Sequence, residues 1–145
     1  MGGAIGKDTQ SQISVRQKVL KDETPDSKKS LTRFERIKSF KTTTLLRCIP
    51  KTGRTNQIRV HLDSIGHSLI GDKLYGRSDD EFLEFIRYVK AGGHPSWPGH
   101  LETSRQMLHA SRLSFKHPVT DRMATFESPL PRDFIEYLEN QKENL

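Results

Sequence analysis

The chain turns into a helix within the segment Thr52-Gly53-Arg54-Thr55-Asn56-Gln57-Ile58-Arg59-Val60-His61-Leu62. Thr55 is suited to the N-cap position, because its hydroxyl can accept a hydrogen bond from a backbone N–H of the first turn. Ile58 and Leu62 lie four residues apart, which is the spacing of one apolar helix face. Gly66 can end a helix in the left-handed conformation. We therefore predict a helix over residues 55–65.

Arg59 needs an anionic partner in this helix. Val60 makes a second side of the helix apolar, so Arg59 is expected at the edge of a packed element. A guanidinium held there pairs best with a planar anion such as a carboxylate or phosphate. Asp63, four residues further on, offers an ordinary ion pair along the helix, worth about 0.3–0.5 kcal/mol on a surface. On this helix alone, the structural and the functional interpretations of Arg59 both stay open.

Composition limits the class of protein. The chain has 145 residues, 32% of them hydrophobic and 29% charged, which suits either a very polar domain or part of one. A net charge of +6 favours a polyanionic partner such as nucleic acid. Cys48 is the only cysteine, which excludes an intrachain disulfide and suits a cytoplasmic location. No apolar run resembles a membrane span or a signal peptide.

The remaining elements follow from hydrophobic spacing and turn residues. Residues 1–30 are polar and glycine-containing, and we expect them to be loose or extended, with a short strand at Ile13 and Val15. Residues 31–145 form the folded part, with hairpins over 31–49 and 108–127 and helices over 80–91 and 132–142. This pattern predicts an α+β fold, in which helices pack on a mixed, mostly antiparallel sheet built from hairpins.

A loop over residues 92–105 contains the other residues that invite a functional interpretation. His94 and His100 lie six residues apart among prolines and glycines, with no cysteine nearby, so we expect no metal site. Trp97 has two interpretations: it stacks on a base of single-stranded RNA, or it anchors the loop.

Four ordered blocks of the sequence resemble the RluA-type pseudouridine synthases. They are residues 52–61 (TGRTNQIRVH), 66–76 (GHSLIGDKLYG), 108–118 (LHASRLSFKHP) and 126–134 (FESPLPRDF). The order and spacing of the blocks are those of the family, and together they cover most of residues 31–134. The resemblance implies the C-terminal part of the family's catalytic domain.

The resemblance also implies a reaction, the isomerisation of uridine to pseudouridine within ribosomal or transfer RNA, without a cofactor. In the family, an aspartate in a His-Arg-Leu-Asp segment attacks or assists the detached base, and a basic residue keeps this carboxylate ionised. Arg59 occupies the position of that basic residue. No His-Arg-Leu-Asp segment occurs in residues 1–145. We therefore expect this chain to lack the nucleophile and to be inactive alone.

Four residues beside Arg59 are candidates for RNA contact by the same resemblance: Arg54, Thr55, Asn56 and Gln57. Asn56 departs from the histidine that is commoner at its position in the family. His61 is expected to pack inside the protein. Asp72 and Tyr75 match a loop at the rim of the active site, where neither is expected to replace the missing aspartate.

Two functions of different classes remain. The first is an RNA pseudouridine synthase to which this chain contributes Arg59, with RNA and the missing catalytic half as partners. The alternative is a non-catalytic RNA-binding or assembly module derived from that family. Self-association through exposed strand edges is a further expectation, whereas no membrane partner is expected. Whether the chain is an enzyme is left open.

Overall fold

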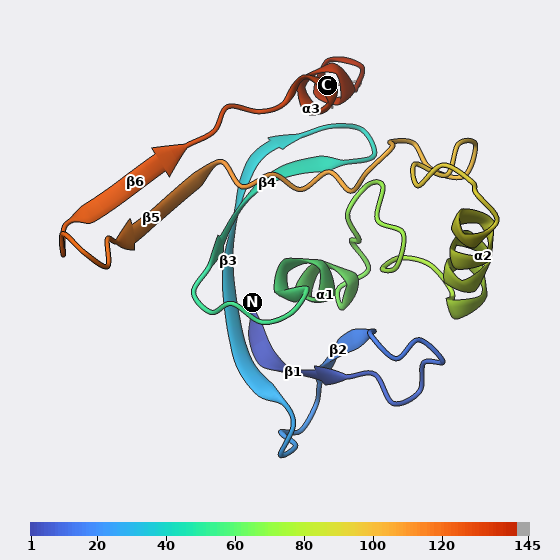
Figure 1. Ribbon diagram of the computed structural model, residues 1–145, viewed down its shortest axis with the longest axis horizontal. Coiled ribbons are helices and arrows are strands. Elements are labelled where there is room, and N and C mark those ends of the chain that lie inside the picture. Colours follow the sequence, from blue (N-terminus) through green and yellow to red (C-terminus); the bar gives the residue numbers. More distant parts are fainter. Residues whose placement is uncertain (142–145) are drawn as a thin grey trace.

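The computed structural model describes residues 1–141, which form two antiparallel sheets and three helices (Figure 1). The larger sheet has the strand order β2-β1-β3-β4, and the smaller sheet pairs β5 with β6. The strands are β1 at Gly2–Lys7, β2 at Gln17–Leu20, β3 at Lys28–Ser39, β4 at Thr44–Pro50, β5 at Arg112–Lys116 and β6 at Met123–Glu127. The helices are α1 at Gln57–Asp63, α2 at Asp79–Lys90 and α3 at Arg132–Glu139. The predicted α+β class is confirmed.

Both predicted hairpins are present. In the first, β3 pairs with β4 in a register that places Phe34 opposite Cys48, with an irregularity between Arg36 and Lys38. In the second, β5 pairs with β6 and projects from the body of the protein (Figure 1). Helix α2 begins one residue before its predicted start. Helix α3 ends at Glu139, and residue 142 of the predicted helix lies outside the described part of the chain.

The first 30 residues are more regular than predicted. β1 pairs with β2 on one side and with β3 on the other, so this segment is extended and belongs to the larger sheet. The strand predicted at Ile13 and Val15 is wrong, because these residues lie in the loop between β1 and β2. Glycines occur in β1 because the side chains of β2 lie across it: a Cβ at Gly6 would come within 2.7 Å of the Leu20 side chain.

Helix α1 is shorter than predicted. It begins at Gln57, and the N-cap residue is Asn56 in the left-handed conformation (φ 56°), without a side-chain cap. The predicted cap at Thr55 is therefore wrong, and asparagine suits the observed position because it tolerates positive φ better than most residues. Gly66 adopts φ 75° just after the helix, as predicted.

Helix α1 lies across one face of the larger sheet (Figure 1). Its Val60 belongs to a buried cluster with Ile5, Ile13, Leu74 and Tyr75. These five residues come from four segments, since Leu74 and Tyr75 are neighbours in the loop between α1 and α2. The core therefore fastens α1 to β1, to the β1–β2 loop and to the loop that follows α1.

His61 connects α1 to β3 through a chain of buried hydrogen bonds. The Ser30 hydroxyl donates to the Gly3 carbonyl (2.8 Å), so its oxygen accepts from His61 Nε2–H (2.8 Å). On the other side of the ring, Gln57 Nε2 donates to Thr32 Oγ1 (2.9 Å), whose hydroxyl then donates to His61 Nδ1 (3.0 Å). This assignment requires a neutral imidazole with the proton on Nε2.

We expect His61 to make the protein less stable in mild acid. Burial lowers the pKa of His61 below its ordinary value of 6.5. Below about pH 6.5 the unfolded chain therefore binds a proton that the folded chain does not. The free energy of unfolding should fall as the pH falls from about 6.5 to the lowered pKa, by about 1.4 kcal/mol for each unit of lowering.

Urea unfolding at pH 7.5, 6.0 and 5.0 measures this loss. A His61→Gln variant lacks the buried imidazole. The control variant His67→Gln replaces an exposed histidine and retains His61. Wild type and His67→Gln should lose stability more steeply than His61→Gln. Parallel pH profiles for all three proteins would contradict the assignment.

Gly71 should not tolerate alanine. Its φ is +73°, and a Cβ there would lie 2.2 Å from both the Arg105 carbonyl oxygen and Thr103 Oγ1. We expect Gly71→Ala to lower the free energy of unfolding by about 3 kcal/mol, because strain at positive φ adds to the clash with backbone.

Gly66→Ala is the matched control, since Gly66 has a similar φ of +75° but no atom within 4 Å of the added Cβ. Gly66→Ala should lower the free energy of unfolding by about 1–2 kcal/mol, through the unfavourable positive φ alone. Denaturant unfolding measures the loss of stability in each variant, and the difference between them is the contribution of the steric clash. Equal losses of stability would contradict the close approach at Gly71.

The loop before β5 is anchored on α2. Trp97 is 2% exposed, and its ring centroid lies 5.3 Å from that of Phe85 in α2. The same ring stacks on that of His100 in the loop, with 4.4 Å between ring centroids. The anchoring interpretation of Trp97 is therefore confirmed, because a buried ring is not free to stack on a base. No helix within the described residues is long and apolar enough to cross a membrane.

Candidate functional site around Arg59

Arg59 forms a two-point ion pair with Asp72. Its Nε and Nη2 atoms each lie 2.7 Å from one oxygen of the Asp72 carboxylate. The Asp72 side chain is fully buried, whereas that of Arg59 is 16% exposed. The alternative ion pair between Arg59 and Asp63 is not formed; Asp63 instead accepts hydrogen bonds from the Ser68 hydroxyl and the Gly76 backbone N–H.

Asp72 serves as a fixed counterion. Besides the two bonds from Arg59, it accepts backbone N–H bonds from Leu74 (2.9 Å) and Tyr75 (3.0 Å). Three of these four hydrogen bonds converge on Oδ1, whereas Oδ2 accepts from Arg59 Nε. Its full burial and its two-point bond with Arg59 suit a role in orienting the guanidinium and not that of an attacking group.

Two further residues hold the guanidinium. Asn56 Oδ1 accepts a hydrogen bond from Arg59 Nη1 (2.9 Å), and the left-handed conformation of Asn56 brings its side chain to that place. The guanidinium carbon lies 4.8 Å from the centroid of the Tyr75 ring. Burial raises the pKa of the Tyr75 hydroxyl, so this ring is neutral at pH 7. Arg59 is therefore fixed by charge, by hydrogen bonding and by an aromatic face.

The guanidinium keeps donors for a second anion. Of its five N–H groups, three donate to Asp72 and Asn56. One N–H on Nη1 and one on Nη2 have no partner among the described residues. A second carboxylate or a phosphate needs two such donors. Because Arg59 is held on its other sides, it can bind that anion without first becoming ordered.

The four residues predicted to contact RNA are placed differently. Gln57 is 4% exposed, and its amide bonds to Thr52, to the Arg54 backbone, to Leu31 and to Thr32. Its side chain therefore has no donor or acceptor left for RNA. Thr55 is exposed. Arg54 donates one hydrogen bond from Nε to the Lys29 carbonyl (2.9 Å), and its terminal nitrogens have no hydrogen-bond partner among the described residues. Asn56 faces Arg59, as described above.

Arg54 and Thr55 border a cavity of about 220 Å³ beside the start of α1. The other lining residues are Ile5, Gln17, Asp26, Lys28 and Gly53. Two of the lining side chains are cationic and one is anionic. No group of three or more His, Cys, Asp or Glu side chains with metal-binding geometry occurs in the described part of the chain.

Sequence reasoning missed Asp72 as the partner of Arg59. The two residues are 13 positions apart, in different local structures, so helical spacing cannot reveal the pair. The one available signal is the sequence Gly71-Asp72-Lys73-Leu74-Tyr75, in which glycine permits a tight turn and aspartate commonly accepts the N–H groups that follow it.

Known proteins match this chain across the site. A family model described as RNA pseudouridylate synthase matches residues 5–64, which include Arg59. The chain is 38% identical over 106 residues to ribosomal large subunit pseudouridine synthase D of Zymomonas mobilis, a match that covers 73% of this chain and 30% of that protein. It is 35% identical over 134 residues to the protein of the same name from Haemophilus influenzae, covering 82% of this chain and 37% of that protein.

A third relative is an uncharacterized RNA pseudouridine synthase of Bacillus subtilis, 36% identical over 121 residues. That match covers 83% of this chain and 33% of the relative. The chain thus spans about a third of the length of these curated relatives.

Proposed function

The chain belongs to the RNA pseudouridylate synthase family, and we propose that it supplies Arg59 to an enzyme that converts uridine to pseudouridine in ribosomal or transfer RNA. The observation that carries this proposal is the state of Arg59. Its guanidinium is partly buried and held on three sides, with two N–H donors left over. This is the arrangement that a reactive carboxylate requires of its counterion.

The reaction needs such a counterion. The bond between N1 and the ribose C1′ breaks, a bond between C5 and C1′ forms, N1 gains a proton and C5 loses one. A carboxylate that attacks or assists the detached base must be ionised, although a closed site disfavours its charge. The fork of Arg59 would keep this carboxylate ionised and orient it. Since Asp72 is already committed, we assign the nucleophile to a His-Arg-Leu-Asp segment outside residues 1–145.

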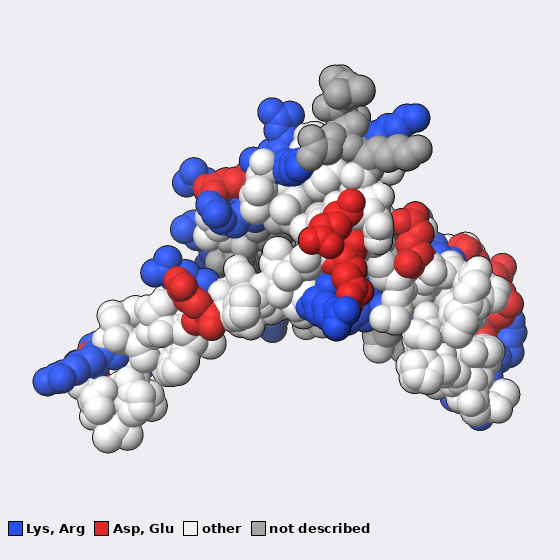
Figure 2. Space-filling model, turned by 90° about the horizontal axis from the view of Figure 1, so that it is seen from above, with Lys and Arg blue, Asp and Glu red and all other residues white. Residues whose placement is uncertain are grey.

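The apolar face of the β5–β6 hairpin is the surface on which we expect the segment that carries this aspartate to pack. Leu113 pairs with Phe126, and Phe115 with Ala124, so these four residues share one face of the hairpin. Leu113 is 59% exposed and Phe126 60% exposed. Among the described elements no other helix or strand packs on this hairpin, which projects as an arm in Figure 2. A two-stranded hairpin is marginally stable alone, so we expect its apolar face to be covered.

RNA contact is proposed for Arg54 and Thr55, which border the cavity beside α1 together with Lys28. Phosphate contacts by cations supply most of the sequence-independent affinity for nucleic acid. The surface in Figure 2 carries Lys and Arg interspersed with Asp and Glu, so the charge of +6 is not gathered into one basic patch on that face. The cavity beside α1 is thus the more specific candidate.

The test is reconstitution. We define the reconstituted protein as this chain combined with the part of the Zymomonas mobilis synthase that precedes the matched region. Ribosomal RNA carrying tritium at C5 of uridine releases tritium to water when the base is isomerised. The reconstituted protein should release tritium, whereas this chain alone should release none.

Three other results of the binding and tritium-release measurements would contradict the proposal. Salt-sensitive RNA binding without tritium release from any combination would favour the non-catalytic binding module. Release by the chain alone would place a nucleophile within residues 1–145. Neither binding nor release would overturn both functions.

A further inference from the structure

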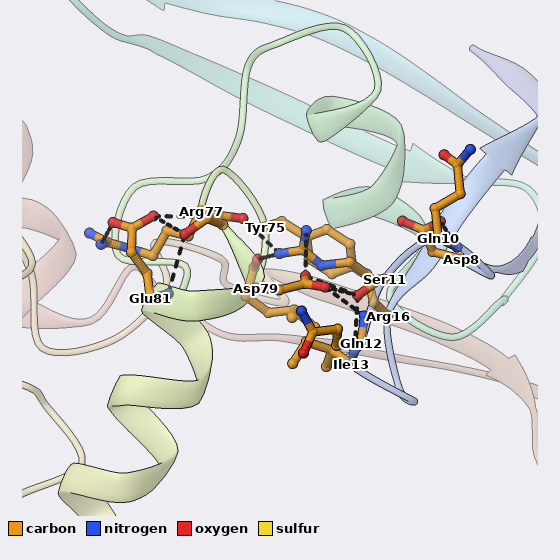
Figure 3. Close-up of polar contacts among 12 residues, drawn as sticks. Asp8, Gln10, Ser11, Gln12, Ile13, Arg16, Tyr75, Arg77, Asp79 and Glu81 are labelled. Carbon is orange, nitrogen blue, oxygen red and sulfur yellow. Dashed lines mark hydrogen bonds and ion pairs between the residues drawn. The ribbon is translucent and has the colours of Figure 1, made fainter.

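Arg16 lies at the centre of a second polar cluster, formed by the β1–β2 loop, the start of α2 and the loop between α1 and α2 (Figure 3). Its Nη1 atom lies 3.2 Å from Asp79 Oδ1, and the two side chains are only 16% and 18% exposed. Arg16 is therefore a largely buried, paired cation and not a solvated surface charge.

Arg16 fastens the loop that holds Arg59. Its Nη2 atom donates to the carbonyl oxygens of Leu74 and Arg77, the second at 2.7 Å. Between these residues lies Tyr75, whose hydroxyl accepts a hydrogen bond from the Gln17 backbone N–H (3.2 Å). The segment from Asp72 to Arg77 is therefore bonded on one side to Arg16 and Gln17. On the other side, its Asp72 and Tyr75 contact Arg59.

Asp79 keeps Arg16 in place. Its carboxylate accepts hydrogen bonds from the Ser11 hydroxyl (2.7 and 2.9 Å) and from the Gln12 backbone N–H (2.7 Å), besides the ion pair with Arg16. Figure 3 shows these partners converging on one carboxylate, which lies at the first residue of α2. The β1–β2 loop is thereby tied to α2 at the point where the Asp72–Arg77 segment ends.

The network is not optimised for stability alone. Arg16 Nε is buried and has no hydrogen-bond partner among the described residues. An unpaired buried N–H costs about 1–3 kcal/mol, which offsets part of what the other bonds of Arg16 contribute. Arg16 fixes the relative position of two segments. Its guanidinium bonds to two carbonyl oxygens of the Asp72–Arg77 segment and to the carboxylate of Asp79 in α2.

We propose that Arg16 is a positioning residue for Arg59, which it orients through the Asp72–Arg77 segment. This inference rests on the proposed function for its catalytic consequence, whereas its structural part concerns this chain alone. Loss of the fork should loosen Asp72 and Tyr75 together, and Arg59 with them.

Arg16→Lys tests the structural part in the full chain. Lysine keeps the charge beside Asp79 but cannot bridge two carbonyl groups at the same time. We expect hydrogen exchange of Arg59 Nε–H, followed by NMR, to accelerate about tenfold because its partner Asp72 opens locally. Arg105 Nε–H is the internal control, since it forms a similar pair with Asp133 Oδ2 (2.7 Å) elsewhere in the protein.

Two further variants keep the test decisive. Asp79→Asn is milder, since it removes the charge that holds Arg16, and should accelerate Arg59 exchange several-fold. Lys18→Gln is the matched control, because Lys18 pairs with Asp8 (2.7 Å) near the same loop and should leave Arg59 unchanged. Unchanged exchange at Arg59 in folded Arg16→Lys and Asp79→Asn, or equal acceleration at Arg59 and Arg105, would overturn the proposal.

The catalytic part is measured separately in the reconstituted protein. Arg16→Lys should lower kcat about tenfold with KM unchanged, and should change kcat less than twofold in an Arg59→Lys background. Additive effects of the two substitutions would overturn the positioning role in catalysis. If the wild-type reconstituted protein releases no tritium, the proposed function fails, and the exchange measurement still decides whether Arg16 orients Arg59.

Discussion

Replacing Arg59 with lysine is expected to lower the kcat of the reconstituted protein roughly 10²–10³-fold, the range seen when one preorganised charge donor is removed from an active site. The guanidinium binds Asp72 through two nitrogens and still has one donor on each terminal nitrogen. A lysine ammonium is a single point charge, and it cannot grip Asp72 at two points while presenting a second fork. The incoming carboxylate would lose orientation and part of its stabilising charge.

Single-turnover tritium release measures the effect, and its pH dependence adds a readout that simple misfolding would not produce. A weaker counterion raises the pKa of the reactive carboxylate, so the acid limb of the Arg59→Lys profile should move to higher pH. Arg47→Lys is the control, because Arg47 is exposed on β4 and pairs with Glu35, and it makes no contact with Arg59 or its partners among the described residues. Full activity in Arg59→Lys, with RNA binding intact, would remove Arg59 from the reaction.

The fold was largely predictable where local pattern and tertiary contact agree. Hairpin β3–β4 has β-branched and apolar residues on both sides of a short turn, and helix α2 has an apolar stripe behind a polar cap. β1 was missed because glycine has low strand propensity, and the reason for glycine there is the close approach of β2. Only the folded neighbour makes that requirement visible.

The candidate site was predictable in its central residue and less so in its contacts. The resemblance singled out Arg59, and the structure supplies a fixed, partly buried guanidinium. It does not follow from the sequence that Gln57 points inward to β3 or that Asn56 takes positive φ and turns toward Arg59. Both follow from the observed N-cap at Asn56, one residue after the predicted cap at Thr55.

The contacts of Arg16 could not be predicted from the sequence. A basic residue in a polar segment is most often solvated, and the sequence has no periodicity there to suggest otherwise. Its contacts with Leu74, Arg77 and Asp79 span about 60 positions of the chain, so only the packing of the β1–β2 loop against α2 creates them. The residues that orient a site from a distance are thus harder to predict than the residue at its centre.

Asp72→Asn is expected to lower the free energy of unfolding by about 3 kcal/mol, near the lower end of the range for breaking a buried ion pair, because Arg59 is partly exposed. The side-chain shape is kept, but the charge is lost and an amide N–H₂ replaces one acceptor oxygen. If the remaining oxygen still accepts from Leu74 and Tyr75, the new amide must face Arg59 Nε–H, and two donors then oppose each other. Urea unfolding at pH 7 measures the loss.

Asp63→Asn is the matched control, since Asp63 accepts hydrogen bonds from the Ser68 hydroxyl and the Gly76 backbone N–H but, among the described residues, contacts no guanidinium. It should lose about 1 kcal/mol or less, because a single amide oxygen can still accept both bonds. Equal losses in the two variants would mean that the backbone bonds of the aspartate, and not its pairing with Arg59, hold the loop. A much larger loss at Asp72 would mean that the charge of Arg59 is tolerated only beside a fixed carboxylate, so that an incoming second carboxylate would meet a cation already neutralised in part.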